Sequence, residues 1–200
     1  MLITFEGIDG SGKSTQIGLL REALEKEGLE VSVFREPGGS DVSEMIRGIL
    51  LNPELEIDPV TELLLFSAAR SQLVAEQVNP LLKENKIVIL DRFYDSTIAY
   101  QGYGRASLPL EQIQQINTIA AHSLVPDLTF YIKLSREDAE ERISHVRKDR
   151  MESAGESFFD KVIEGFDHLA ENETRFVTVN GLLPVQEIHS QVLQKVLQQL

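Results

Sequence analysis

The fold of this chain is decided near its N-terminus by the stretch Gly7-Ile8-Asp9-Gly10-Ser11-Gly12-Lys13-Ser14-Thr15. The stretch fits the phosphate-binding pattern GxxxxGK[ST], and it lies between a short apolar run and a helical pattern, as this motif requires. Its glycines let successive backbone N–H groups turn toward a phosphate, and the helix that follows adds unpaired amides and its positive dipole end. We therefore expect Lys13 to reach the β- and γ-phosphates of a nucleotide, and the Ser14 hydroxyl to bind Mg²⁺.

Short apolar runs alternate with amphipathic patterns along the rest of the chain, which predicts a parallel α/β sheet. Right-handed crossovers would place the helices on both faces of that sheet. Without repeats or linkers, residues 1–200 are expected to form one domain. The five predicted strands are Leu2–Phe5, Glu30–Phe34, Ile87–Leu90, Leu128–Leu134 and Phe176–Val179. The predicted helices are Lys13–Lys26, Ser43–Leu51, Pro59–Lys83, Leu110–His122, Arg136–Val146, Ser157–Asn172 and Pro184–Gln199.

Composition excludes several classes of function. Nineteen Lys and Arg against 32 Asp and Glu give 19 − 32 = −13, and such a surface repels nucleic-acid backbones and anionic membranes. The absence of cysteine excludes disulfides, zinc–thiolate sites, iron–sulfur clusters and cysteine nucleophiles. No apolar run approaches the ~18 residues of a membrane helix, and the N-terminus lacks a basic leader. We expect a cytoplasmic protein whose partners are small molecules.

Charged residues follow the second and third predicted strands, at the end where an open α/β sheet binds its ligand. Arg35-Glu36 leaves the second strand and Asp91-Arg92 leaves the third. Two arginines at one crevice suit a phosphate held bidentately. Asp91 is placed to contact the Mg²⁺ shell, and it could also cap the helix that follows.

A second group of residues has the chemistry of a base-binding pocket. Phe66 and Arg70 are four residues apart, so they share one helix face, where a ring and a guanidinium could stack on and hydrogen-bond a base. Core packing is the alternative for Phe66, but an arginine on an apolar helix needs an anion or acceptors. Thr97, Tyr100 and Gln101 follow helical spacing and offer polar groups to the same crevice.

Two further segments bear on the class of protein. A GTPase would need NKxD after a strand, whereas Asn85-Lys86 precedes one. The polar segment Arg147–Ser157 lies between two predicted helices, and it is either a mobile lid or a plain solvated loop.

With these motifs, the chain resembles the bacterial thymidylate kinase family. The matching segments FEGIDGSGKST, REPGG, LLFSAAR, DRFYDSTIAYQG, PDLTFYIKL and DRMES run in order from residue 3 to about 170. The resemblance implies a P-loop kinase that transfers a phosphoryl group from ATP to dTMP, giving dTDP and ADP with Mg²⁺. It also suggests a homodimer.

The resemblance implies roles for the base-side residues. Phe66 would stack on thymine, while Arg70, Thr97 and Gln101 would read its edge. Tyr100 would crowd the sugar and disfavour a 2′-hydroxyl.

It implies phosphate-side roles as well. Asp9 would lie near the sugar and phosphate of dTMP. Arg35 and Arg92 would hold the substrate phosphate, and Glu36 would support their loop.

The family keeps its catalytic cation either in the P-loop or in the lid. Here the P-loop has Gly10, while the lid has Arg147, Lys148 and Arg150, so the chain resembles the lid type. Which of the three acts stays open, as do the adenine contacts, expected near Asn180–Leu183.

The expected chemistry needs no general base, because the second pKa of a monophosphate is about 6 and its oxygens are already ionised at pH 7. Catalysis then consists of alignment and charge neutralisation by Lys13, Arg92, the metal near Asp91 and a lid arginine. Two alternatives stay open. One is a kinase for another nucleoside monophosphate or for a deoxynucleoside, with Glu36 as base; the other is a P-loop regulator that hydrolyses ATP slowly.

Overall fold

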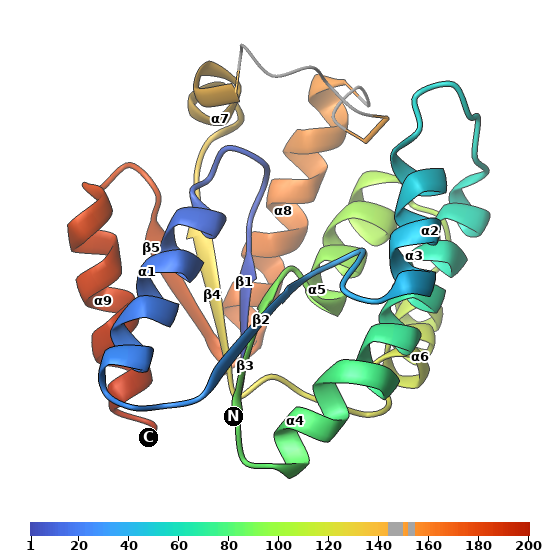
Figure 1. Ribbon diagram of the computed structural model, residues 1–200. Helices are drawn as coiled ribbons and strands as arrows, with labels where there is room; N and C mark the ends of the chain where they lie inside the picture. The colour runs from blue at the N-terminus through green and yellow to red at the C-terminus, as the bar shows by residue number, and fades with distance from the viewer. Residues whose placement is uncertain (144–149, 152–154) are drawn as a thin grey trace.

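One sheet of five parallel strands forms the centre of the computed structural model (Figure 1), which describes residues 1–143, 150–151 and 155–200. Its strand order is β2-β3-β1-β4-β5, so the predicted α/β class and parallel sheet are confirmed. Each predicted strand boundary shifts by no more than one residue. The strands are β1 (Leu2–Glu6), β2 (Val31–Arg35), β3 (Ile87–Asp91), β4 (Leu128–Lys133) and β5 (Phe176–Asn180).

Helices cover both faces of the sheet (Figure 1). α1 (Lys13–Lys26) and α9 (Val185–Leu197) lie on one face, where their apolar residues pack against alternate residues of the strands, such as Ile89. On the other face, Val88 and its neighbours pack against the helix that precedes β3. The central strand β3 is buried at Ile87, Val88, Ile89 and Leu90, and these four residues are all apolar because both faces of the strand are covered. The remaining α-helices are α2 (Asp41–Leu51), α3 (Pro59–Leu73), α4 (Asn79–Lys83), α5 (Tyr94–Thr97), α6 (Leu110–Ala120), α7 (Arg136–Ile143) and α8 (Glu156–Asn172).

Two π-helical segments, which have wider turns than an α-helix, were not predicted from the sequence. The predicted helix Pro59–Lys83 is α3, a π-helical segment η1 (Val74–Val78) and α4 in succession. A second π-helical segment, η2 (Ile98–Gly104), follows α5 directly. The predicted helix Arg136–Val146 can be followed only to Ile143, because its last three residues lie outside the described part of the chain.

The pairing register of the strands places the predicted site residues at one edge of the sheet. Asp91 pairs with Phe5 of β1 on one side and with Arg35 of β2 on the other. The P-loop after β1, the Arg35 loop and the Asp91-Arg92 segment therefore leave three neighbouring strands side by side. Among the described residues, no helix is both long and apolar enough to span a membrane.

Candidate active site

The P-loop has the backbone that its glycines predict. Gly12 precedes α1 with φ 101°, a left-handed conformation that favours glycine. A Cβ on Gly7 would lie 2.7 Å from the carbonyl oxygen of Ile132, so no side chain fits there. Lys13 is buried, and its Nζ donates to the carbonyl oxygens of Gly7 and Ile8 at 3.0 Å. The lysine therefore lies across the loop whose amides would bind a phosphate.

Ser14 and Asp91 meet at the mouth of this loop. The Ser14 hydroxyl donates to Oδ2 of Asp91 at 3.0 Å. A hydroxyl beside a carboxylate supplies the hard oxygen ligands that Mg²⁺ prefers, so the pair fits the expected ion. The alternative N-cap role of Asp91 is not seen, because α5 begins at Tyr94 after Phe93.

Arg92 holds a strained backbone conformation beside the P-loop. Its φ is 71°, which is uncommon for a residue with a side chain. Its guanidinium donates to Asp9 at 2.8 Å and to Ser96 at 3.2 Å and lies 5.1 Å from the centre of the Tyr100 ring. Burial would raise the pKa of Asp9, but Arg92 and Lys13 outweigh it and hold that pKa at about 2.

Glu6 fixes the loop that carries Arg92, and the sequence analysis missed it. Its carboxyl is fully buried and accepts hydrogen bonds from the Phe93 amide at 2.8 Å and from the Ser96 hydroxyl at 2.6 Å. Burial, with Asp95 nearby, raises the pKa of Glu6 to about 8. The available signal was an acid at the end of a buried strand, since such a group needs partners.

A cavity of about 710 Å³ lies over the P-loop and is lined by Arg35, Asp91 and Arg92 among others. Arg35 is half-exposed and pairs with Glu44 at 3.0 Å. Arg47, which the sequence analysis also missed, lines the same cavity and donates to the carbonyl oxygen of Pro37 at 2.9 Å. With Lys13 and with Arg142 of α7, five cationic residues line this cavity, and each comes from a different segment.

A second cavity adjoins the first and is lined by all five predicted base-side residues, Phe66, Arg70, Thr97, Tyr100 and Gln101. The two cavities share four lining residues: Asp9, Glu36, Arg47 and Arg92. The charged groups therefore stand at the junction, with the phosphate loop on one side and the aromatic pocket on the other.

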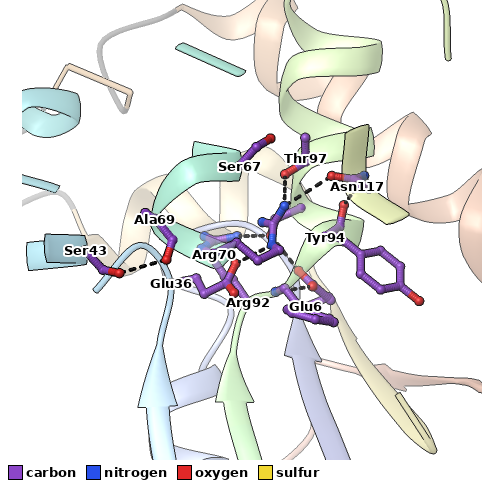
Figure 2. A network of polar contacts seen from close by, with 12 residues as sticks. Glu6, Glu36, Ser43, Ser67, Ala69, Arg70, Arg92, Tyr94, Thr97 and Asn117 are labelled. Atoms are coloured by element: carbon purple, nitrogen blue, oxygen red, sulfur yellow. Dashed lines mark hydrogen bonds and ion pairs between the residues drawn. The ribbon is translucent and has the colours of Figure 1, made fainter. Parts of the chain in front are cut away.

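Figure 2 shows Arg70 at the centre of the polar contacts beside this second cavity. Its buried guanidinium donates to Glu36 at 2.8 Å, to Thr97 at 3.0 Å and to Asn117 at 3.1 Å. Burial raises the pKa of Glu36, although Arg70 acts in the opposite direction. Asn117 on α6 was not predicted, because nothing in its local sequence indicates that α6 contacts Arg70.

Of the three cationic residues predicted in the lid, only Arg150 lies within the part of the chain that the structure describes. Arg150 forms an ion pair with buried Glu62 at 2.6 Å and donates to the carbonyl oxygen of Leu50 at 2.7 Å. It is not among the lining residues of the phosphate cavity. Arg147 and Lys148 lie outside the described residues.

Arg142, at the end of α7, lines the phosphate cavity instead, and the sequence analysis did not name it. It donates to the carbonyl oxygens of Gly10 at 3.3 Å and Gly181 at 2.8 Å. Gly181 and Leu183, from the stretch expected to meet adenine, line this cavity too.

Comparison with known proteins gives one consistent result. A family model described as thymidylate kinase matches residues 5–192. A thymidylate kinase of Prosthecochloris aestuarii is 47% identical, with 98% of this chain and 93% of that protein covered. Those of Chlorobium luteolum (48%; 97% and 95% covered) and Caldanaerobacter subterraneus (45%; 97% and 93% covered) are similarly close. The matched length includes every residue that lines either cavity.

Proposed function

Since the chain belongs to the thymidylate kinase family, we propose that it transfers the γ-phosphoryl group of Mg-ATP to dTMP, giving dTDP and ADP. One observation carries the proposal. The phosphate cavity and the aromatic cavity share Asp9, Glu36, Arg47 and Arg92, so the phosphate of a nucleotide bound in the second cavity would meet the donor at this junction.

The reaction then depends on alignment and charge. Lys13 would contact the β- and γ-phosphates, and Arg92, held by Asp9 and Ser96, would bind the acceptor phosphate. Two polyanions brought together in line need little else, because the phosphoryl group passes through a loose transition state with its charge on the oxygens. Arg35 and Arg47, at the rim of the same cavity, would add to the field that attracts them.

Ser14 and Asp91 would hold Mg²⁺, through water for the carboxylate. When bound, the ion supplies charge neutralisation at the phosphate oxygens.

No general base is required for a monophosphate acceptor, whose oxygens are largely ionised at pH 7. The alternative of a deoxynucleoside kinase needs a base beside the acceptor hydroxyl, and Glu36 was the candidate. Its Oε2 accepts from Arg70 at 2.8 Å in a buried pair. That pairing favours a supporting role for Glu36 over proton abstraction.

We extend the proposal to a homodimer. Three helices that pack together, α2, α3 and α6, carry exposed apolar side chains: Met45, Leu64 and Ile119 are 72%, 52% and 77% exposed. Large exposed apolar residues on adjoining elements are typical of an interface, and a second copy of the chain is the occupant that the family resemblance suggests.

ADP release with Mg-ATP, measured with dTMP, dUMP, dCMP, UMP, dAMP and thymidine in turn, tests the proposal. We expect strong turnover with dTMP, weaker turnover with dUMP and none with UMP, because Tyr100 would crowd a 2′-hydroxyl. Turnover with thymidine but not dTMP would indicate a nucleoside kinase. ADP release that no acceptor changes would favour the regulator.

A further inference from the structure

Glu62 is a buried carboxylate that holds one side chain of the base pocket. It lies in the first turn of α3 and is 1% exposed. Its Oε1 accepts a hydrogen bond from Nε2 of Gln101 at 2.9 Å and another from Nε of Arg105 at 3.3 Å. Its Oε2 pairs with Arg150 at 2.6 Å. Gln101 lines the base pocket, whereas Glu62 stands behind it and is not among the lining residues.

The two arginines matter because they pair with the Glu62 carboxylate at a position away from water. A carboxylate taken out of water is tolerated only when it is paired and hydrogen-bonded, and Arg105 and Arg150 supply both. Arg105 is itself held over the Phe158 ring, 4.6 Å from its centre. An ionised carboxyl has no proton to donate, so it can only accept.

This restriction fixes the orientation of the Gln101 amide. A glutamine amide ordinarily rotates to suit its neighbours, since one end donates and the other accepts. Beside a carboxylate that two arginines already pair with, only Nε2 of the Gln101 amide can face Glu62. The carbonyl Oε1 is the end left for a ligand, and within the described part of the chain no group donates to it.

We infer that Glu62 is a positioning residue for specificity: by locking Nε2 of Gln101 toward itself, it presents a carbonyl acceptor to the pyrimidine edge. This inference rests on the proposed function. Thymine and uracil carry an N–H at N3, which Oε1 can accept. Cytosine carries a lone pair at N3, which would face the carbonyl without a hydrogen. The buried polar groups left unpaired then penalise cytosine.

The test compares dUMP with dCMP, which differ only at this edge of the ring. The measured quantity is the ratio of kcat/KM for dUMP to that for dCMP, in wild type and in Glu62→Gln. A glutamine at position 62 can donate or accept, so the Gln101 amide is free to turn. We expect the ratio to fall about tenfold. Glu62→Asp keeps the charge and should keep most of the ratio, and Glu84→Gln, at an exposed site, should not change it.

A purely structural role for Glu62 would lower kcat/KM for both nucleotides by the same factor, and an unchanged ratio overturns the inference. Absence of dTMP turnover by the wild type contradicts the proposed function instead. Should Glu62→Gln fail to fold, neutron diffraction of the deuterated wild type with dTMP decides. The expected result is deuterons of Nε2 pointing at Glu62 and the N3 deuteron pointing at Oε1. The reverse amide orientation overturns the inference.

Discussion

At the scale of single residues, the site depends on a few ionisable side chains that hold one another in place. Arg92 keeps a left-handed backbone because Glu6 binds the next amide and the Ser96 hydroxyl while Asp9 takes the guanidinium. Strain of this kind costs about 1–3 kcal/mol and persists only where neighbours enforce it. This strain is consistent with a role for Arg92 in which its guanidinium must point at a substrate.

Replacing either central cation should nearly abolish turnover. We expect Arg92→Ala and Lys13→Ala each to lower kcat/KM for dTMP by about 10³-fold or more, because charge on the transferred group loses its partner. Arg21→Ala, which removes an exposed cation that pairs with Glu25, is the matched control and should keep wild-type kinetics. Near-wild-type kinetics in either site variant would contradict the assignment.

The raised pKa of Glu6 predicts that the stability of the folded protein depends on pH. Its folded pKa of about 8 stands above its ordinary value of 4.5, so between these values the folded protein holds a proton that the unfolded chain has released. The stabilisation from that proton is complete below pH 4.5 and is lost as the pH rises through 8. A pKa difference of one corresponds to about 1.4 kcal/mol.

Urea unfolding of wild type and Glu6→Gln at pH 5, 6.5 and 8 measures this effect. We expect the unfolding free energy of the wild type to fall relative to that of the variant across the series. Parallel pH profiles for the two proteins would show that Glu6 does not titrate in this way.

At the scale of elements, sequence reasoning succeeded where one period repeats and failed where tertiary contacts decide. β3 reads IVIL because it is buried on both faces, and Phe66 and Arg70 share a helix face because four residues separate them. Nothing local marks the π turns of η1 and η2, since a widened turn depends on what packs against it. The start of α2 was predicted two residues late, at Ser43, although a local signal was available: the Ser40 hydroxyl caps the helix by accepting from the Ser43 amide.

The packing of α8 on η2 supports the base pocket, because η2 carries Tyr100 and Gln101. A Cβ on Gly165 of α8 would lie 3.0 Å from Cα of Ala99 and from the Tyr103 ring. Gly165→Ala should therefore destabilise the protein by about 1–3 kcal/mol through overpacking and raise KM for dTMP.

Gly18→Ala is the matched control for that variant. Gly18 lies in the middle of α1, and a Cβ there would meet nothing within 4 Å. The Gly18→Ala substitution should stabilise the protein by about 0.5–1 kcal/mol, because alanine favours the helical conformation more than glycine does. Thermal unfolding of the two variants should shift in opposite directions, and equal shifts would contradict the packing argument.

At the scale of the whole molecule, the P-loop and the alternation of strands and helices were enough to predict the sheet and the edge where the site lies. Glu62, Asn117 and Arg142 were not predicted, because each reaches the site from a helix whose position depends on the completed fold. The partner of Arg150 was not predictable either. Its motif indicated a place in the lid, and the ion pair with Glu62 is seen only in the structure.

The proposed homodimer is tested by equilibrium sedimentation. Ile119→Asp introduces a charge on the α2–α3–α6 face and should convert a dimer into a monomer, because a buried unpaired charge is costly. Leu197→Asp changes an exposed apolar residue of α9, on the other side of the sheet, and should leave the mass unchanged. A monomeric wild type would contradict the proposal.

We propose that a phosphoryl group is transferred from ATP to a nucleoside monophosphate at the junction of the two cavities. A single turnover with γ-³²P-labelled Mg-ATP and dTMP tests it most directly, with the products separated by chromatography. We expect the label to appear in dTDP, at the β-phosphate, and the Arg92→Ala variant to produce no labelled dTDP. Label recovered as inorganic phosphate, with dTMP unchanged, would contradict it.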